Sequence, residues 1–294
     1  MRSAVLPSVG DWQVKKKHAT PGGWAFEFDN DFYPDIDDTA VVPRALADLH
    51  LGDATRHRAE AVRRGLKWAV SMQCGNGGWA AFDRDNNKRF LEHVPFADFM
   101  TPLDPTSPDV TAHMLELLGE TVGYDWPVQR AIDYLKREQL SDGAWYGRWG
   151  VNYLYGTGLA LSGLRAIGED VGQEYVQRAA RWLEAHQNPD GGWGETCGTY
   201  DDPSLRGQGV STASQTAWAL IGLLAAGLRS SDAVSRGVVY LLDTQARDGS
   251  WREDPYTGTG FPRAFYLRYD LYRIYFPLLA LAKYKKDISD VGAT

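Results

Sequence analysis

The sequence predicts an all-α fold of the α/α-toroid type, in which a ring of buried helices lies inside a ring of amphipathic helices. Three observations predict this fold. Apolar residues recur at helical spacing with almost no strand-like alternation, the motif Q-x-x-x-G-x-W occurs four times, and charged helical segments alternate with apolar ones. A linear helical solenoid is the competing interpretation, and the uneven spacing of the four glutamines argues mildly against it.

Each copy of the motif ends a charged helix. The copies cover residues 73–79, 139–145, 187–193 and 245–251. Before the third copy, Val176, Ala179, Ala180 and Leu183 follow i, i+3, i+4, i+7 spacing and therefore share one helix face. The motif glycine ends the helix and turns the chain. We expect the motif tryptophans to have a structural role, packing neighbouring helices together at the turns: Trp79, Trp145, Trp193 and Trp251.

The segments between these charged helices are more apolar and carry fewer charges, so we expect them to form the inner ring. They cover residues 37–51, 109–123, 157–168, 212–228 and 265–284. Composition does not shift along the chain and no linker is apparent. We therefore expect one toroid domain over residues 21–286, between an irregular segment at 1–20 and a tail at 287–294.

Composition narrows the class of protein. Hydrophobic residues make up 44% and charged residues 23%, as in a globular protein with a real core, but the aromatic fraction of 12% implies aromatic side chains that pack a core or line a cavity. The net charge of −7 and the scattered basic residues make nucleic acid a poor partner. Cys74 and Cys197 are too few for a disulfide framework or a cysteine-based zinc site. With no signal-peptide pattern and no span of membrane length, we expect a cytoplasmic protein.

Three carboxylates crowd the segment "FYPDIDDTAVV" at residues 32–42, where Asp35, Asp37 and Asp38 directly precede a helical run. One interpretation is helix capping, because aspartate is favoured at a helix N-terminus. A single aspartate would satisfy that need, whereas three repel one another. In a poorly solvated site at least one would hold its proton at neutral pH and serve as an acid. The spacing alone leaves both interpretations open.

The segment "PGGWAFEFDNDFYPDIDDTAVV" closely resembles the D-x-D-D-T-A segment of squalene–hopene cyclases, and Q-x-x-x-G-x-W is the repeated motif of that superfamily. The similarity covers roughly residues 10–285 and is carried by further segments at 145–158, 186–195, 211–220 and 258–284. The resemblance implies a class II terpene cyclase of triterpenoid and hopanoid biosynthesis. Such an isomerase protonates squalene or a shorter linear polyprene and cyclises it through carbocations, with no cofactor and no metal.

The resemblance also implies roles for the acidic cluster. Asp37 matches the acid that protonates the terminal C=C bond, and Asp35 and Asp38 match its flanking carboxylates. His113 matches the histidine that hydrogen-bonds the cluster, with Asp109 one helical turn earlier on the same face. Because an alkene is a very weak base, a protonated His113 would help by making Asp37 a stronger acid. Without the resemblance, a lone histidine on a helix is more often a satisfied core residue.

The aromatic surplus has a role in the same chemistry, because an aromatic face stabilises a cation by roughly 0.5–2 kcal/mol without attacking it. By motif match, the cavity aromatics are Phe26, Trp149, Phe261 and Phe265. The active-site tyrosines are Tyr155, Tyr269 and Tyr272, with Tyr155 near the acid through ordered water. Core packing remains the alternative for the other aromatic residues.

Two departures from the family pattern matter. Phe82 stands where the family often has a cavity tyrosine. Family enzymes also carry a second, related toroid that supplies the far wall of the cavity and most of the membrane-docking surface. We therefore expect an excised domain, one subunit of a split enzyme, or a natural single-domain cyclase. A homodimer or a second toroid would complete the cavity, with peripheral contact at the inner membrane.

Two other classes of function compete with the cyclase. A binding or assembly module that turns over nothing until a partner completes the cavity shares every motif with it. Another α/α-toroid enzyme is the third hypothesis. A protein prenyltransferase β subunit needs a zinc set of Asp, Cys and His, but both cysteines lie beside repeat turns. A toroidal glycosidase needs two carboxylates about 5–9.5 Å apart and would not explain the segment at 258–273. The sequence favours cyclase chemistry.

Overall fold

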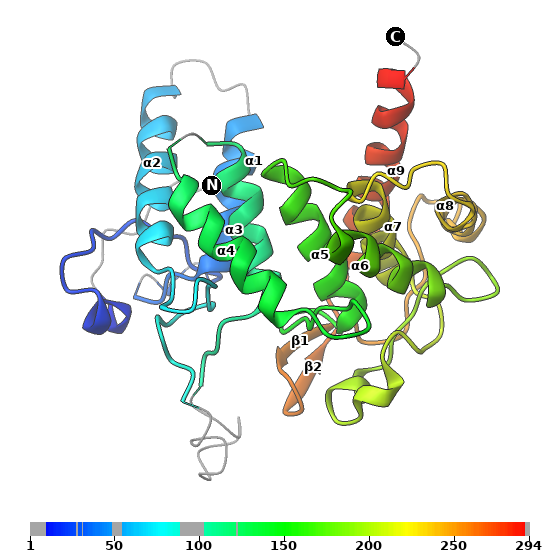
Figure 1. The fold of residues 1–294 in the computed structure, drawn as a ribbon, viewed down its shortest axis with the longest axis horizontal. Coiled ribbons are helices and arrows are strands. Elements are labelled where there is room, and N and C mark those ends of the chain that lie inside the picture. Colours follow the sequence, from blue (N-terminus) through cyan, green and yellow to red (C-terminus); the bar gives the residue numbers. More distant parts are fainter. Residues whose placement is uncertain are drawn as a thin grey trace. The chain divides into compact units, whose positions relative to one another are not determined.

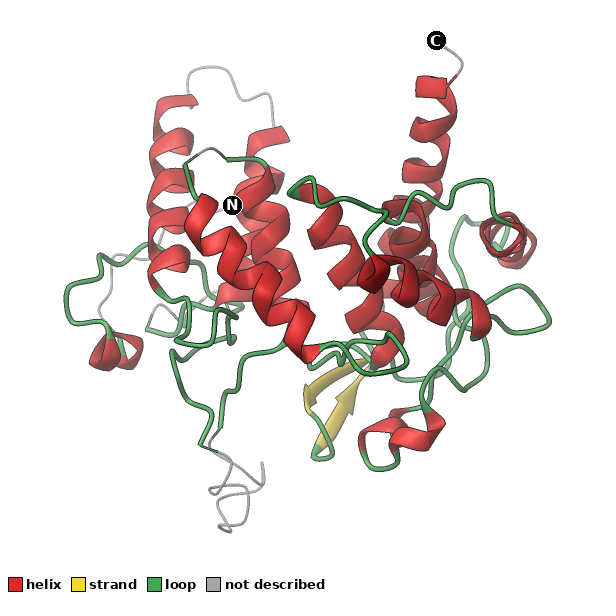
Figure 2. Ribbon diagram, in the orientation of Figure 1, coloured by secondary structure: helices red, strands yellow, loops and turns green. Residues whose placement is uncertain are grey.

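The computed structural model describes residues 10–27, 29–30, 32–48, 55–88, 103–121 and 123–291. Within these ranges helices dominate, and the only sheet is a two-stranded antiparallel hairpin (Figure 2). The chain divides into two compact units, Met1–Leu135 and Lys136–Thr294. The single domain predicted over residues 21–286 spans both of them.

The first unit is built on helix α1. Its elements are the 3-10 helix η1 (Asp11–Lys15), α1 (Ile36–Asp48), α2 (Thr55–Ser71), α3 (Pro108–Gly119) and most of α4 (Asp125–Glu138), which crosses into the second unit. Helix α1 packs against both α2 and α3 (Figure 1). Helix η1 lies in the segment predicted to be irregular and is anchored by Trp12, whose ring meets Trp68 of α2 edge-on at 5.7 Å.

The second unit is built on helix α7, which packs between α5 and α9 (Figure 1). Its elements are α5 (Tyr153–Ala166), α6 (Glu174–Ala185), η4 (Cys197–Tyr200), η5 (Pro203–Leu205), α7 (Ala213–Ala225), α8 (Asp232–Thr244), β1 (Gly258–Phe261), β2 (Phe265–Leu267) and α9 (Tyr272–Val291). Helices α6 and α8 both contact α7, and α6 also contacts α5.

The predicted alternation of apolar and amphipathic helices is confirmed from α3 to α8, whereas α9, predicted as an inner helix, buries only Pro277 and Ala280 between Tyr272 and Lys286. Helices α3, α5 and α7 are buried over almost their whole length, whereas α4, α6 and α8 each bury a single face. In α4 the buried residues are Ala131, Ile132, Tyr134 and Leu135, which is the stripe expected at 3.6 residues per turn. Burial of that stripe stabilises these short helices more than their intrinsic propensity does.

The motif tryptophans join helices at the repeat turns, as predicted. All four are essentially inaccessible to solvent. The indole N–H of Trp193 donates to the Leu183 carbonyl oxygen near the end of α6 at 2.8 Å, and its backbone N–H donates to Thr216 Oγ1 of α7 at 2.9 Å. Each tryptophan of this kind therefore connects the end of a charged helix to the apolar helix beside it.

The motif glutamines extend these connections to the following helix. The Gln187 side-chain amide donates to the carbonyl oxygens of Gly191 and Ala233, both at 2.8 Å, which ties its own turn to the start of α8. The Arg236 guanidinium of α8 donates to the remaining oxygen of the Gln187 amide. Gln73 and Gln139 repeat this pattern with the carbonyl oxygens of Pro127 and Tyr175.

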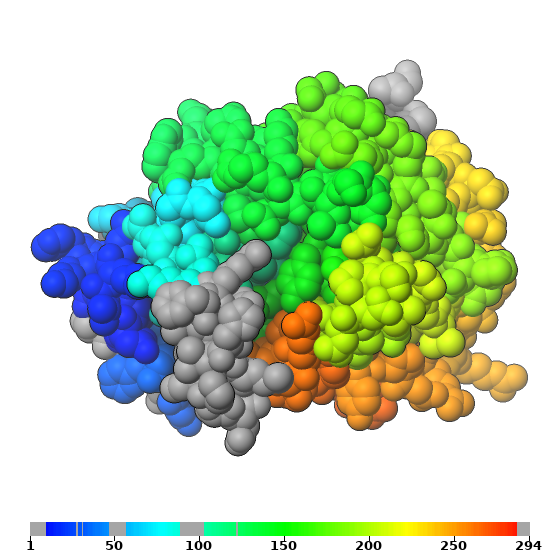
Figure 3. Space-filling model, turned by 60° about the horizontal axis from the view of Figure 1, so that its bottom comes forward, coloured from blue at the N-terminus to red at the C-terminus, as the bar shows by residue number. Residues whose placement is uncertain are grey.

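The end of the chain differs from the helix predicted over residues 265–284. Residues Phe265–Leu267 form β2, and α9 begins only at Tyr272 and continues to Val291, beyond residue 286. Glycines account for the hairpin, since a Cβ at Gly260 would lie 2.0 Å from the Phe265 ring. In Figure 3 the hairpin (orange) lies beside the loop that carries η4 and η5 (yellow-green), where Arg263 donates to the Tyr200 carbonyl oxygen at 2.8 Å.

Candidate active site

Asp37 and His113 meet across the contact between α1 and α3. Asp37 lies in the first turn of α1, and His113 lies in the second turn of α3. The Nδ1 atom of His113 is hydrogen-bonded to Asp37 Oδ1, although the two residues are 76 positions apart in the sequence. Their side chains are 14% and 33% exposed, so the carboxyl group of Asp37 stays accessible while the imidazole is nearly covered.

Capping of α1 falls to Asp35. Its Oδ1 atom accepts the backbone N–H of Asp38 at 2.7 Å, and its own N–H donates to the Trp24 carbonyl oxygen at 2.9 Å. Asp35 is only 4% exposed, and its second carboxylate oxygen has no hydrogen-bond partner among the described residues. One aspartate therefore meets the structural need of the helix, and Asp37 is directed to His113 instead.

The flanking carboxylates retain protons more strongly than ordinary aspartates. Burial raises the pKa of Asp35 well above its usual range, and the charges of Asp38 and Asp37 raise it further. Burial also raises the pKa of Asp38. Asp35 and Asp38 therefore keep their protons to higher pH than free aspartates do, as expected of buried carboxyl groups beside other acids.

The pKa of His113 is raised as well, but by its charged neighbours and against the effect of burial. Burial lowers its pKa, but the charge and hydrogen bond of Asp37 outweigh burial, and Glu116 and Asp109 add to the effect, so that the pKa of His113 rises to about 9. Asp109 is 1% exposed and lies in the first turn of α3, one turn before His113. The imidazole is therefore protonated at neutral pH, and its hydrogen bond to Asp37 is charge-assisted.

The N-terminus of α1 differs from those of α5 and α7, each of which meets a buried glutamate. Glu195 accepts the Leu154 N–H at 2.9 Å, and Glu253 accepts the Ser214 N–H at 2.8 Å. Both glutamates follow a motif tryptophan by two residues. At α1 the corresponding position is Ala81, whose carbonyl oxygen accepts the Ile36 N–H at 2.7 Å. The aspartates of the segment at 35–38 supply the negative charge there.

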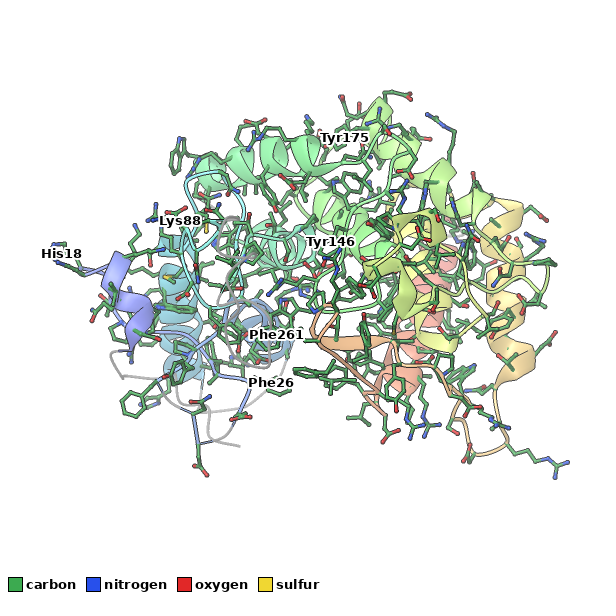
Figure 4. The ribbon with its side chains drawn as sticks, turned by 90° about the horizontal axis from the view of Figure 1, so that it is seen from below. His18, Phe26, Lys88, Tyr146, Tyr175 and Phe261 are labelled. Atoms are coloured by element: carbon green, nitrogen blue, oxygen red, sulfur yellow. The ribbon has the colours of Figure 1, made fainter. Side chains whose placement is uncertain are left out.

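The predicted cavity aromatics of the second unit form one contact series. Trp149 lies 6.4 Å from Phe261, and Phe261 lies 5.8 Å from Phe265, both measured between ring centroids. Phe261 is on strand β1 (Figure 4). The structure thus brings Trp149 to two hairpin residues that lie far from it in the sequence.

The predicted tyrosines of the second unit gather around Trp218, which the sequence analysis did not single out. The ring of Trp218 lies 4.7 Å from Tyr155 and 5.9 Å from Tyr272, and Tyr272 lies 4.7 Å from Tyr269. Its position in the apolar segment 212–228 was the available signal, because a tryptophan there faces other inner helices. Tyr155 belongs to the second unit and the aspartates to the first, so its place beside the acid remains a prediction.

Two predicted aromatic residues lie in the first unit. Phe26 is in the loop before α1, and its side chain is 69% exposed (Figure 4). Phe82 is half-buried, and its backbone N–H donates to Asp104 Oδ2 at 2.6 Å. Asp104 therefore fixes the backbone of the segment in which the expected tyrosine hydroxyl is missing.

In the ranges that the structure covers, no group of three or more His, Cys, Asp or Glu side chains is arranged to hold a metal ion. None of the helices described has the length and apolar character needed to cross a bilayer.

A family model described as the squalene–hopene cyclase C-terminal domain matches residues 1–286. The chain belongs to this family. The squalene–hopene cyclase of Alicyclobacillus acidocaldarius is 56% identical over 282 residues, which cover 95% of this chain and 44% of that protein. The dammaradiene synthase of Dryopteris crassirhizoma is 47% identical over 317 residues, covering 95% of this chain and 46% of the synthase. This family member therefore spans less than half the length of these curated relatives.

Solved structures agree on the fold. The type II terpene cyclase MstE from Scytonema, in a variant bound to its substrate geranylgeranyl dihydroxybenzoate, superposes with a TM-score of 0.62 at 21% identity. The match covers 93% of this chain and 80% of that one. The apo form of MstE matches at a TM-score of 0.57 and 23% identity, over 86% of this chain and 67% of the other. Together with the family match, these likenesses confirm the predicted all-α fold of the α/α-toroid class.

Proposed function

We propose that this chain is the acid-bearing domain of a class II terpene cyclase, which starts the cyclisation of squalene or a shorter linear polyprene by protonation. The observation that carries the proposal is the hydrogen bond between Asp37 and His113 beside two carboxylates with raised pKa values. Two further facts support the substrate class. Curated relatives are named squalene–hopene cyclases, and MstE binds a geranylgeranyl-bearing substrate.

Asp37 is the proton donor in this mechanism. Its O–H bond breaks as the π electrons of the terminal alkene form a new C–H bond, which leaves a tertiary carbocation and the Asp37 carboxylate. Protonated His113 donates its Nδ1–H to that carboxylate and stabilises it at the moment it forms. The positive charge that favours proton release from Asp37 is therefore already in place before the reaction begins.

Asp35 and Asp38 act on the same proton. Both keep their protons at pH values at which an ordinary carboxyl ionises, so they store the proton that passes to the Asp37 carboxylate after the product leaves, and solvent then replaces it. Asp109 supports the charge of His113 from the neighbouring turn. The substrate cation then moves among aromatic faces, the role we assign to Phe26, Trp149, Phe261 and Phe265 and to Tyr155, Tyr269 and Tyr272.

A second candidate function follows from the length of the relatives. The chain spans 44% of the Alicyclobacillus enzyme, so a domain that binds the polyprene but turns over nothing until a second copy or a second toroid closes the cavity is the alternative. In either case we expect a cytoplasmic protein with peripheral membrane contact, because a linear hydrocarbon substrate partitions into membranes rather than water.

The test is to incubate the purified chain with squalene, and separately with farnesol, in mild detergent without added metal and to identify products by gas chromatography–mass spectrometry. We expect cyclised product from the wild type and none from Asp37→Asn, which keeps the shape of the side chain but has no transferable carboxyl proton. Circular dichroism should show equal helical content for both chains.

The outcomes separate the two candidates. Cyclisation by a folded Asp37→Asn variant would refute the assigned acid. If the folded wild type binds a polyprene but forms no product, the domain needs a partner wall, and adding the second toroid of a relative should then give turnover that depends on Asp37. Failure of that assay would contradict the cyclase proposal itself.

A further inference from the structure

An ion-pair cluster joins α1 to α3 a short distance beyond the acid pair. Arg44 contacts Glu116 Oε2 through Nη1 at 2.5 Å and Glu120 Oε1 through Nε at 3.0 Å. Arg44 follows Asp37 by seven residues, and Glu120 follows His113 by the same number. Because seven residues advance a helix by roughly 10.5 Å, equal spacing at both contacts fits two helices that run in the same direction in one fixed register.

The two glutamates differ in burial. The Glu116 side chain is 11% exposed, whereas that of Glu120 is 50% exposed. An exposed ion pair contributes about 0–1 kcal/mol, but a buried carboxylate that loses its partner is strongly destabilising. Burial opposes the charge of Arg44, yet Glu116 and Glu120 raise the pKa of its guanidinium. Glu116 is thus a charged group that the fold keeps inside the molecule by means of Arg44.

Glu116 also lies beside the acid site. It follows His113 by three residues, so the two side chains share a face of α3. The charged groups that face His113 are Asp37 and Asp38 from α1 and Asp109 and Glu116 from α3. Arg44 brings a positive charge to the same contact through its pairing with Glu116.

We propose that Glu116 is a positioning residue of the acid site. Anchored by Arg44, it holds α3 in register on α1 and supplies a negative charge beside His113, so that the imidazole remains protonated while it is hydrogen-bonded to Asp37. The Glu116 carboxylate acts through His113 and does not touch substrate. The consequence of this role for catalysis rests on the proposed function. The effect of Glu116 on His113 does not.

A direct test measures the titration of His113 in the full chain, without substrate. Ring resonances of histidine-labelled protein are followed by NMR as the pH is changed, and His113→Gln identifies the signal. The wild-type midpoint is expected at about 9. Glu116→Gln keeps the shape but removes the charge, so the midpoint should fall by roughly half a pH unit or more, since a nearby opposite charge shifts a pKa by about 1–3 units and this one is shared with Arg44.

Glu120→Gln is the matched control. It removes the other carboxylate that pairs with Arg44, one turn farther along α3, and should move the His113 midpoint by less than half the shift of Glu116→Gln. Glu116→Asp retains the charge and should return the midpoint close to that of the wild type. A purely structural clamp would instead lower thermal stability in the glutamine variants without moving the titration of His113.

Three outcomes would overturn the proposal. They are an unchanged midpoint in folded Glu116→Gln, an equal shift in Glu120→Gln, and a failure of Glu116→Asp to restore the wild-type midpoint. Circular dichroism establishes that each variant is folded. Because the titration needs no turnover, a chain that shows the expected shifts but forms no product even with the second toroid of a relative would contradict the proposed function and leave the role of Glu116 intact. If product is formed, the alkaline limit of activity should fall in Glu116→Gln in parallel with the midpoint.

Discussion

Asp35 combines two roles that oppose each other. It caps α1 through Asp38, which stabilises the helix, yet it is a carboxyl group buried beside two others, which raises its pKa. A raised pKa means that the folded protein binds this proton more tightly than the unfolded chain does. The contribution of Asp35 to stability therefore declines as the pH rises from its ordinary value through its value in the fold.

Asp35→Asn should consequently stabilise the fold. An asparagine retains the oxygen that accepts the Asp38 N–H but has no proton to lose, so the gain over the wild type should be larger at pH 8 than at pH 5. Asp35→Ala lacks the cap as well and should be about 1 kcal/mol less stable than Asp35→Asn at either pH. Chemical denaturation at both pH values measures these differences. A gain that is the same at pH 5 and pH 8 would contradict the raised pKa.

Within the candidate site, the sequence identifies the acidic residues more directly than it identifies their surroundings. Asp35, Asp37 and Asp38 are adjacent in the chain, so their crowding could be recognised directly. The bond from Asp37 to His113 and the pairing of Arg44 with Glu116 join residues 76 and 72 positions apart, which no local pattern encodes. The sequence pointed to His113 only through the family resemblance, and the neighbours that set its pKa are identified by the fold.

At the repeat turns, too, the motif residues lie close together in the sequence whereas their hydrogen-bond partner lies far away. The Gln, Gly and Trp of each motif lie within seven residues and define a pattern. The threonine that accepts the tryptophan N–H lies 12, 23 or 32 residues later, on the next apolar helix. Trp24 uses Thr39 in the same way, 15 residues on, so a degenerate copy with His18 in place of Gln precedes the four clear ones. Because the spacing between tryptophan and threonine varies, the sequence motif does not reveal the threonine.

The variants Gln187→Ala and Gln245→Ala test how much the contact from a motif glutamine to the next helix adds to stability. Gln187 makes this contact, and Gln245 belongs to the last repeat. Gln187 contacts its own turn, the Ala233 carbonyl oxygen and Arg236, whereas in the described part of the chain the Gln245 amide donates only to Gly249. Each net hydrogen bond is worth about 1 kcal/mol, and an unpaired partly buried partner costs more. We expect Gln187→Ala to lose about 1–2 kcal/mol more than Gln245→Ala in urea unfolding. Equal losses would show that the link to α8 adds no stability.

For the whole chain, the alternation of charged and apolar helices was sufficient to predict the fold class. Helix α6 buries one face, whereas α7 is buried along almost its whole length, and this difference is visible in the sequence. The start of α9 was placed too early because the aromatic residues of 265–271 suit a strand as well as a helix. Only the pairing with Gly258–Phe261 decides between the two. This strand pairing is a tertiary contact. Its register depends on Gly258 and Gly260, where a side chain would collide with the rings of Tyr269 and Phe265.

A helix face that remains uncovered leads to a prediction about association. Four large apolar side chains, each between 43% and 66% exposed, recur at helical spacing along α9 and just before it: Leu271, Tyr275, Leu278 and Leu279. Such a face favours contact with another apolar surface. In a solution of this chain alone that surface belongs to a second copy or to detergent.

We therefore expect the purified chain to show a mass that rises with concentration in light scattering, and to bind detergent. Replacing Leu278 and Leu279 together by lysine should yield a monomer that binds little detergent, because charge on both positions removes the gain from burying the face. Lysine at Val239 and Leu242, which are 53% and 55% exposed on α8, is the matched control and should leave association unchanged. A wild type that is monomeric at every concentration and indifferent to detergent would show that α9 needs no cover. An equal effect of the α8 variant would place the contact elsewhere.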